Sequence, residues 1–177
     1  SGDECHTIGL QLALQAFRQT APGQLSITAI NPELRPEFSA FTRLTDFQML
    51  TKIEEINDFL TKTTEELVEV DSLLQGRYNS LVELRKAAQQ PVGKLRLIVV
   101  QDVPQSTKED FRNQLIRILK GAPRAGIAVL YLSSRNSTND NAIIKTIDTL
   151  SNFSSFKFTG NKWISSSVEY EKLSYIF

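Results

Sequence analysis

KLRLIVVQDVP, residues 94–104, is the stretch that decides the fold of this chain. Leu95, Leu97, Ile98, Val99 and Val100 form an apolar, largely β-branched run that is too short for a buried helix and is flanked by residues that break helices. This pattern predicts a β-strand buried on both faces. A helix and a second apolar run, GIAVLYL at 126–132, follow. Strands that alternate with helices indicate an α/β domain with a largely parallel sheet and flanking helices.

The rest of the chain fits one α/β domain over residues 1–177, a length typical of a single domain. The pattern predicts a helix at 5–20, a strand at 25–30 and a proline-rich loop at 31–36. It predicts a helical insertion at about 46–90 and a helix that opens near 106. A further helix at 139–152 and short strands at 156–158 and 162–165 complete the expectation.

The long helical region carries apolar residues at a 3-4 spacing from Ile53 to Leu84, with Leu67 and Leu74 near its centre. This spacing matches a coiled-coil seam. One interpretation is a coiled-coil contact with a partner protein or a second copy of the chain, through Leu67 and Leu74. The alternative is an amphipathic helix or helical hairpin that packs on the chain's own sheet, with a break at Gly76.

Composition limits the classes of function. The 20 basic and 20 acidic residues cancel, which argues against a surface built mainly to hold nucleic acid. Cys5 is the only cysteine, so an intrachain disulfide is excluded and a reducing compartment is expected. No apolar run approaches the length of a membrane-spanning helix. We therefore expect a cytoplasmic protein without membrane contact.

Asp102 ends the first buried strand, at the carboxyl edge where open α/β sheets bind ligands. An apolar strand that ends in a carboxylate has the layout of a Walker B element, in which the acid holds magnesium or orients water. Gln101, however, stands where many such elements have the first of two acids. The alternative is a plain strand whose Asp102 caps the next helix or bonds a nearby hydroxyl or amide, so that Asp102→Asn would cost only about 1 kcal/mol.

An intact phosphate loop is absent from this sequence. Its glycines expose backbone N–H groups, and its lysine and hydroxyl serve the phosphates and magnesium. Gly2, Asp3 and Glu4, directly before the first helix, are the only remnant, and two acids there would repel a nucleotide. Either the site is vestigial, or the loop lies outside this chain.

Two further candidates have weak signals. Cys5 and His6 could form a nucleophilic dyad, but neighbouring residues on a helix point apart. Arg124 lies in the loop before the second strand. It could contact a phosphate, a nucleic acid or a partner protein, or it could cap the carbonyl groups around Gly121.

LRLIVVQDVP (95–104) together with ILKGAPRAGIAVLYLS (118–133) resembles the FtsK/SpoIIIE-type P-loop ATPases of the HerA/FtsK class. In that family a Walker B strand precedes a proline, and a helix leads to a glycine-proline-arginine turn. Here Gln101-Asp102 stands at the position of the acid pair, and the turn includes Arg124. GRYNSLVELRKAAQQ (76–90) resembles the helix that precedes Walker B.

The resemblance implies a RecA-type P-loop core, here without an intact Walker A or Walker B. Our first hypothesis is a catalytically degenerate, FtsK-like domain, expected not to be an enzyme, that acts as a binding or assembly module of a DNA-associated machine. The second is a fragment of an active ATP-driven DNA translocase, which would use ATP and magnesium. The third is an unrelated α/β protein-interaction domain. Under the first we expect no cofactor, no catalytic residue and no resident metal.

Overall fold

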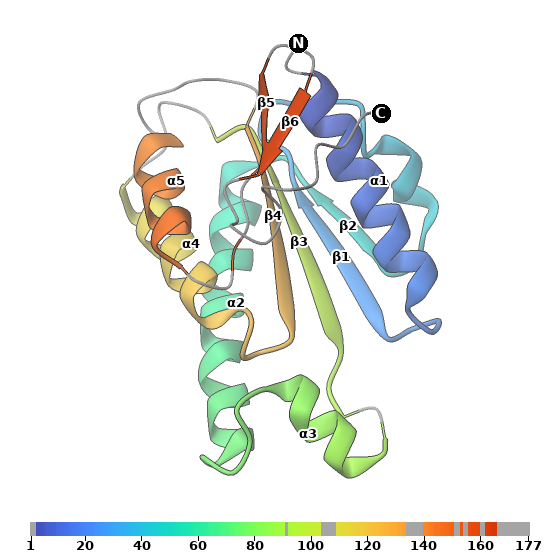
Figure 1. Cartoon of the computed structure of the whole chain (residues 1–177), viewed down its shortest axis with the longest axis vertical. Helices are drawn as coiled ribbons and strands as arrows, with labels where there is room; N and C mark the ends of the chain where they lie inside the picture. Colours follow the sequence, from blue (N-terminus) through green and yellow to red (C-terminus); the bar gives the residue numbers. More distant parts are fainter. Residues whose placement is uncertain are drawn as a thin grey trace.

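The computed structural model describes residues 3–90, 92–103, 109–133, 140–150, 153, 156–159 and 162–165. A four-stranded parallel sheet forms its centre, in the order β2-β1-β3-β4 (Figure 1). The strands are β1 (Leu25–Ile30), β2 (Phe47–Leu50), β3 (Leu95–Gln101) and β4 (Ile127–Leu132). The expected α/β class with a parallel sheet is confirmed, and the two apolar runs that predicted it are neighbouring parallel strands.

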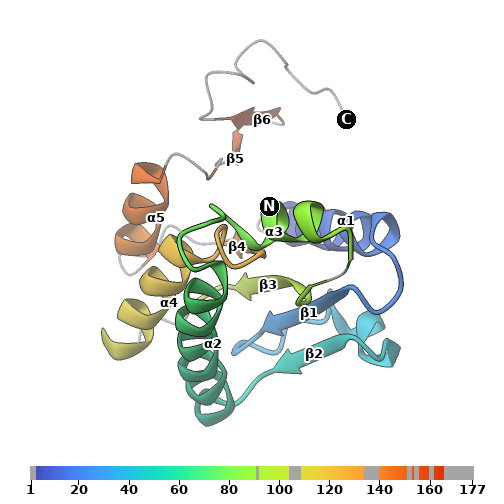
Figure 2. The ribbon, with the colours of Figure 1, turned by 90° about the horizontal axis from the view of Figure 1, so that it is seen from below.

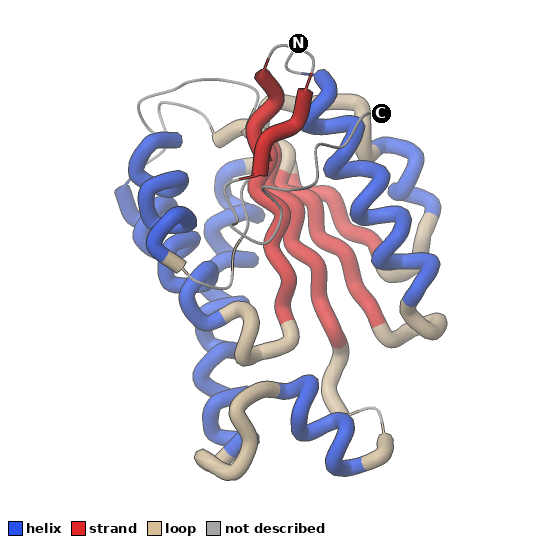
Figure 3. Tube along the Cα trace, in the orientation of Figure 1, coloured by secondary structure: helices blue, strands red, loops and turns tan. Residues whose placement is uncertain are grey.

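Helices cover both faces of the sheet (Figures 2 and 3). Those longer than one turn are α1 (Asp3–Gln19), α2 (Ile53–Leu74), α3 (Leu81–Ala88), α4 (Glu109–Gly121) and α5 (Asp140–Thr149). A short 3-10 helix, η1 (Ser39–Arg43), precedes β2. The strands β5 (Phe156–Thr159) and β6 (Lys162–Ser165) pair with each other in an antiparallel hairpin.

Alternation along the central strands divides the core into two layers. Leu97 and Val99 of β3 face a cluster shared with α1 and η1, whereas Ile98 and Val100 face a cluster shared with α2, α4 and α5. Successive residues of a strand point to opposite faces, so a strand covered on both sides is apolar throughout. The continuous apolar run at 97–100 has this origin.

The predicted helical region differs from the structure at its beginning. Residues 47–50 form β2, which pairs in parallel with β1, so the helices begin only at Ile53. The break predicted at Gly76 is confirmed: Gln75 and Gly76 adopt positive φ angles of 48° and 69°, and α3 starts at Leu81. Part of the stripe along α2 is buried within this chain, through Ile56, Leu60, Thr63 and Leu74, whereas Ile53 is exposed and Leu67 is half-buried.

Thr63 is the polar member of that stripe, and Arg96 of β3 explains it. The Arg96 guanidinium donates a hydrogen bond to Thr63 Oγ1 at 2.9 Å and lies 5.7 Å from the centre of the Phe59 ring. It also pairs with Glu66. Burial lowers the pKa of Arg96. The three partners replace the interactions with water that the buried guanidinium loses. The contacts fix α2 against the amino end of β3.

Candidate functional site

Asp102 lies at the carboxyl edge of the sheet, one residue beyond β3. Its backbone N–H still donates to the carbonyl of Leu132 at 2.9 Å, which extends the ladder between β3 and β4. Its φ of 36° then turns the chain out of the sheet, a conformation that aspartate tolerates better than most residues. The side chain is only 2% exposed, so the carboxylate is held inside the protein.

His6 reaches this carboxylate from α1. Gly9 lets the helix approach β4 closely, since a Cβ at Gly9 would lie 2.4 Å from Leu132 Cδ1. One turn earlier, His6 is fully buried, with Nε2 3.0 Å from Asp102 Oδ2. The amide nitrogen of Gln101 lies 3.4 Å from His6 Nδ1. The geometry suits an imidazole whose Nε2–H donates to the carboxylate while Nδ1 accepts from the amide.

The loop after β1 supplies a second cation. Asn31 clamps this loop: its Oδ1 accepts from the Arg35 N–H at 2.8 Å, and its Nδ2 donates to the Arg35 carbonyl at 2.7 Å. The Arg35 side chain then extends inward, with Nε 2.6 Å from Asp102 Oδ2. Glu37 Oε1 lies 3.6 Å from another guanidinium nitrogen of Arg35. Arg35 therefore lies between two carboxylates.

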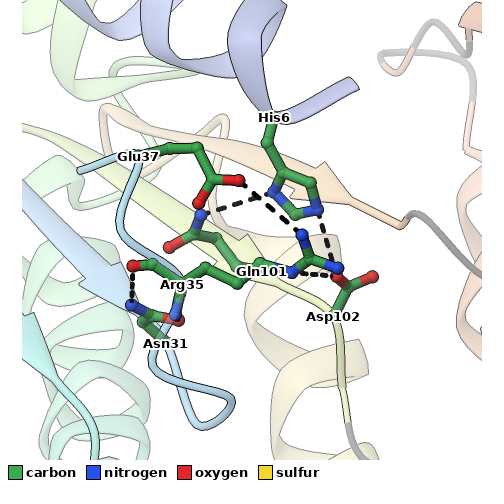
Figure 4. A network of polar contacts seen from close by, with 6 residues as sticks. All are labelled: His6, Asn31, Arg35, Glu37, Gln101 and Asp102. Atoms are coloured by element: carbon green, nitrogen blue, oxygen red, sulfur yellow. Dashed lines mark hydrogen bonds and ion pairs between the residues drawn. The ribbon is translucent and has the colours of Figure 1, made fainter. Parts of the chain in front are cut away.

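Figure 4 shows these side chains converging from α1, the loop after β1 and the end of β3. We call His6, Arg35, Glu37, Gln101 and Asp102 the edge cluster. Its groups do not fit a divalent metal, because Asp102 Oδ2 already meets Arg35 and His6, and a magnesium ion needs several free oxygen ligands. Among the described residues, no group of three or more acidic, histidine or cysteine side chains is placed to hold a metal.

The structure gives Asp102 partners that the sequence did not predict, whereas the predicted helix cap is not tested. Residues 104–108, where that helix was predicted to open, lie outside the described part of the chain. Asp102 Oδ2 lies close to the guanidinium of Arg35, a full cation, and to the imidazole ring of His6. Loss of the carboxylate would leave a largely buried guanidinium without this partner, which costs more than a lost cap.

Cys5 is not suited to nucleophilic catalysis. Burial, and next the negative charge of Asp102, raise the pKa of its thiol to about 11. The reactive form is the thiolate, and at neutral pH almost none is present. The sequence alternative of a Cys5–His6 dyad therefore has no support from the electrostatics of the site.

The predicted phosphate-loop remnant lies only partly in the described chain. Gly2 lies outside it, and Asp3 and Glu4 begin α1. The first turn of α1 lies at the carboxyl edge of the sheet, on the element that carries His6 (Figure 1). Aspartate and glutamate stabilise a helix N-terminus by occupying the place where an anion would otherwise bind.

Leu67, Leu74 and Arg124, which the sequence predicts as interaction residues, do not belong to the edge cluster. On α2, Leu74 is fully buried, and Leu67 is half-buried and packs against Gly121 of α4. Arg124 is exposed just before β4, at the end of the sheet opposite Asp102, and its guanidinium lies 3.0 Å from Asp71 Oδ1. Leu67 and Arg124 thus share one surface between α2 and α4, whereas Leu74 lies in the core.

No protein-family profile matches this chain, and no curated protein sequence does. Solved structures with a similar fold do match this chain. The cytoplasmic domain of the type VII secretion ATPase EccC from Thermomonospora curvata superposes over 84% of this chain with a TM-score of 0.66 and 20% identity. This chain has the fold of an FtsK-like ATPase domain.

A second FtsK-like neighbour is EssC (ATPases 2 and 3) from Geobacillus thermodenitrificans, with a TM-score of 0.60 and 18% identity over 71% of this chain. The chain spans 18% of the EccC chain and 25% of the EssC chain. At these identities the likeness concerns the fold alone. Within the described residues, no helix is long and apolar enough to cross a bilayer.

Sequence reasoning found Gln101 and Asp102 but missed their partners. The sequence pattern indicates His6 only as a partner of Cys5 in a nucleophilic dyad. It places Arg35 in a proline-rich loop without assigning it a role. One signal was present: Asn31 and Gln101 follow Ile30 and Val100, which are paired in register, so both strands end at the same level of the edge. Charged residues soon after the end of such a strand, as Arg35 is, are candidates for the same cluster.

Proposed function

We propose that this chain is a catalytically degenerate, FtsK-like ATPase domain that works as a binding or assembly module of a larger machine. The observation that carries this proposal is the Arg35–Asp102–His6 contact at the end of β3. The Asp102 carboxylate is already paired with a guanidinium of this chain, so its oxygens are not free to bind a magnesium ion. An internal cation there satisfies Asp102 without nucleotide.

Two features of the sequence support the same proposal. Gln101 is neutral and fully buried, so it adds no charge for a divalent ion. Asp3 and Glu4 add negative charge at the helix terminus where phosphates would bind. Each change weakens a different part of a nucleotide site. Together they favour a domain that binds partners through its surface rather than one that hydrolyses ATP.

The alternative is an ATP-hydrolysing domain, which is favoured by the description of both solved neighbours as ATPases. Titration calorimetry with ATP and magnesium separates the two. The degenerate domain gives only the heat of dilution and no phosphate release above background. Micromolar affinity that requires magnesium would contradict the proposal.

DNA association of the parent assembly remains a separate prediction. The formal net charge of zero gives this chain no general attraction for phosphate backbones. We therefore assign the binding role to protein partners first. The surface between α2 and α4 is the most informative place to look for one.

A further inference from the structure

Helices α2 and α4 lie side by side on one face of the sheet (Figures 1 and 2). Gly121 makes their closest approach possible, because a Cβ there would lie 2.9 Å from Leu67 Cδ1. Beside this contact a groove of about 570 Å³ opens along the two helices. We call it the α2–α4 groove.

The groove has an apolar floor that stays in contact with solvent. Leu67 and Val70 are half-buried in it, and Ala125 also lines it. Val68 is 56% exposed, although a valine on a helix gains from burial. An apolar floor of this kind can accept an apolar side chain from outside.

The wall formed by α4 and the following loop is cationic. Arg117, Lys120 and Arg124 line it, and the opposite wall contributes one acid, Asp71. Arg124 pairs with Asp71 across the groove at 3.0 Å. No acidic side chain in the described part of the chain pairs with Arg117 or Lys120, so the groove keeps two positive charges.

We propose that the α2–α4 groove binds an acidic, amphipathic segment of a partner protein. Its apolar side chains would cover Val68 and Leu67, and its carboxylates would face Arg117 and Lys120. The inference rests on the proposed function, since it names the surface and partner chemistry of the binding module. DNA fits less well, because Asp71 and the exposed Val68 both oppose a phosphate backbone.

Selection from a displayed library of random helical peptides tests the proposal on the whole chain. We expect the selected peptides to be enriched in aspartate and glutamate, with apolar residues three and four positions apart. The double variant Arg117→Glu/Lys120→Glu should weaken binding of a selected peptide by at least about tenfold, since like charges then face each other. The matched control Lys62→Glu/Lys86→Glu changes the net charge equally outside the groove and should bind as the unmodified chain does.

Two results would overturn the proposal: selected peptides without acidic enrichment, or acidic peptides that bind both double variants equally. A fluorescent DNA duplex whose binding depends on Arg117 and Lys120, with no acidic peptide selected, would also contradict it and assign the groove to nucleic acid. The groove is distant from Asp102, so these outcomes are independent of ATP binding. Failure of the proposal for the α2–α4 groove and failure of the proposal of a degenerate nucleotide site are therefore distinguishable.

Discussion

Asp102 carries the largest predicted effect of any single residue at the carboxyl edge. Asp102→Asn removes the charge but keeps the shape, and asparagine tolerates the positive φ at this position. The change leaves the Arg35 guanidinium, 19% exposed, without the carboxylate at 2.6 Å. We expect a loss of about 3 kcal/mol of unfolding free energy, measured by urea denaturation at neutral pH.

Asp71→Asn is the matched control for this prediction. It also removes a carboxylate paired with an arginine, but Asp71 is 59% exposed, so water screens the pair. An exposed pair of this kind contributes about 0–1 kcal/mol. Equal losses for the two variants would show that Asp102 and Arg35 are not coupled as the structure describes.

Cys5 reports the electrostatics of the same edge. Since burial and Asp102 raise its pKa to about 11, the rate of alkylation by iodoacetamide should keep rising with pH well beyond the midpoint of about 8.5 typical of a free cysteine. The chain unfolded in urea supplies that reference. Asp102→Asn should move the midpoint of the folded protein downward, because it removes a negative charge that raises the pKa. A folded-state midpoint equal to that of the unfolded chain would contradict the described burial.

At the scale of elements, α2 offers two adjacent leucines in opposite environments. Leu74 is fully buried, whereas Leu73 is 51% exposed. Leu74→Ala should cost about 2–5 kcal/mol, since it leaves a cavity beneath the helix. Leu73→Ala, the matched control, should change the stability by less than about 0.5 kcal/mol. Thermal unfolding of both variants checks the prediction, and similar melting temperatures would mean that α2 is rotated from its described position.

The success of sequence reasoning varied among elements for a physical reason. The strand at 95–100 was predictable because both of its faces are buried from residue 97 onward, which leaves a continuous apolar run at 97–100. β2 was not, because Phe47–Leu50 contains residues that also suit a helix. It is a strand through its pairing with β1, from Ile27↔Phe47 to Ile30↔Leu50. Such tertiary pairing overrides local preference and leaves little trace in four residues.

The apolar stripe along α2 shows a related limit of prediction from sequence. Its 3-4 spacing indicated burial correctly but could not identify the partner, since a sheet, α4 or a second chain would all accept the same stripe. The structure supplies α4 and the sheet. Thr63 breaks the apolar pattern because Arg96 reaches it from β3, a contact between residues 33 positions apart.

At the scale of the whole molecule, the fold separates two surfaces with different chemistry. The carboxyl edge of the sheet holds a compact cluster in which the cation Arg35 lies between two carboxylates. The α2–α4 groove keeps uncompensated cations beside an exposed valine. The FtsK-like fold alone would direct attention to the first surface, whereas the charges direct it to the second for binding.

The central claim is that Arg35 takes the place of a metal beside Asp102. The most direct measurement is the NMR signal of the Arg35 Nε–H group during titration with magnesium and then with magnesium and ATP. The account predicts a slowly exchanging Nε–H signal whose chemical shift stays constant at millimolar magnesium and ATP. A saturable shift that requires both magnesium and ATP would show that the guanidinium yields to a metal–nucleotide complex, and would contradict the account.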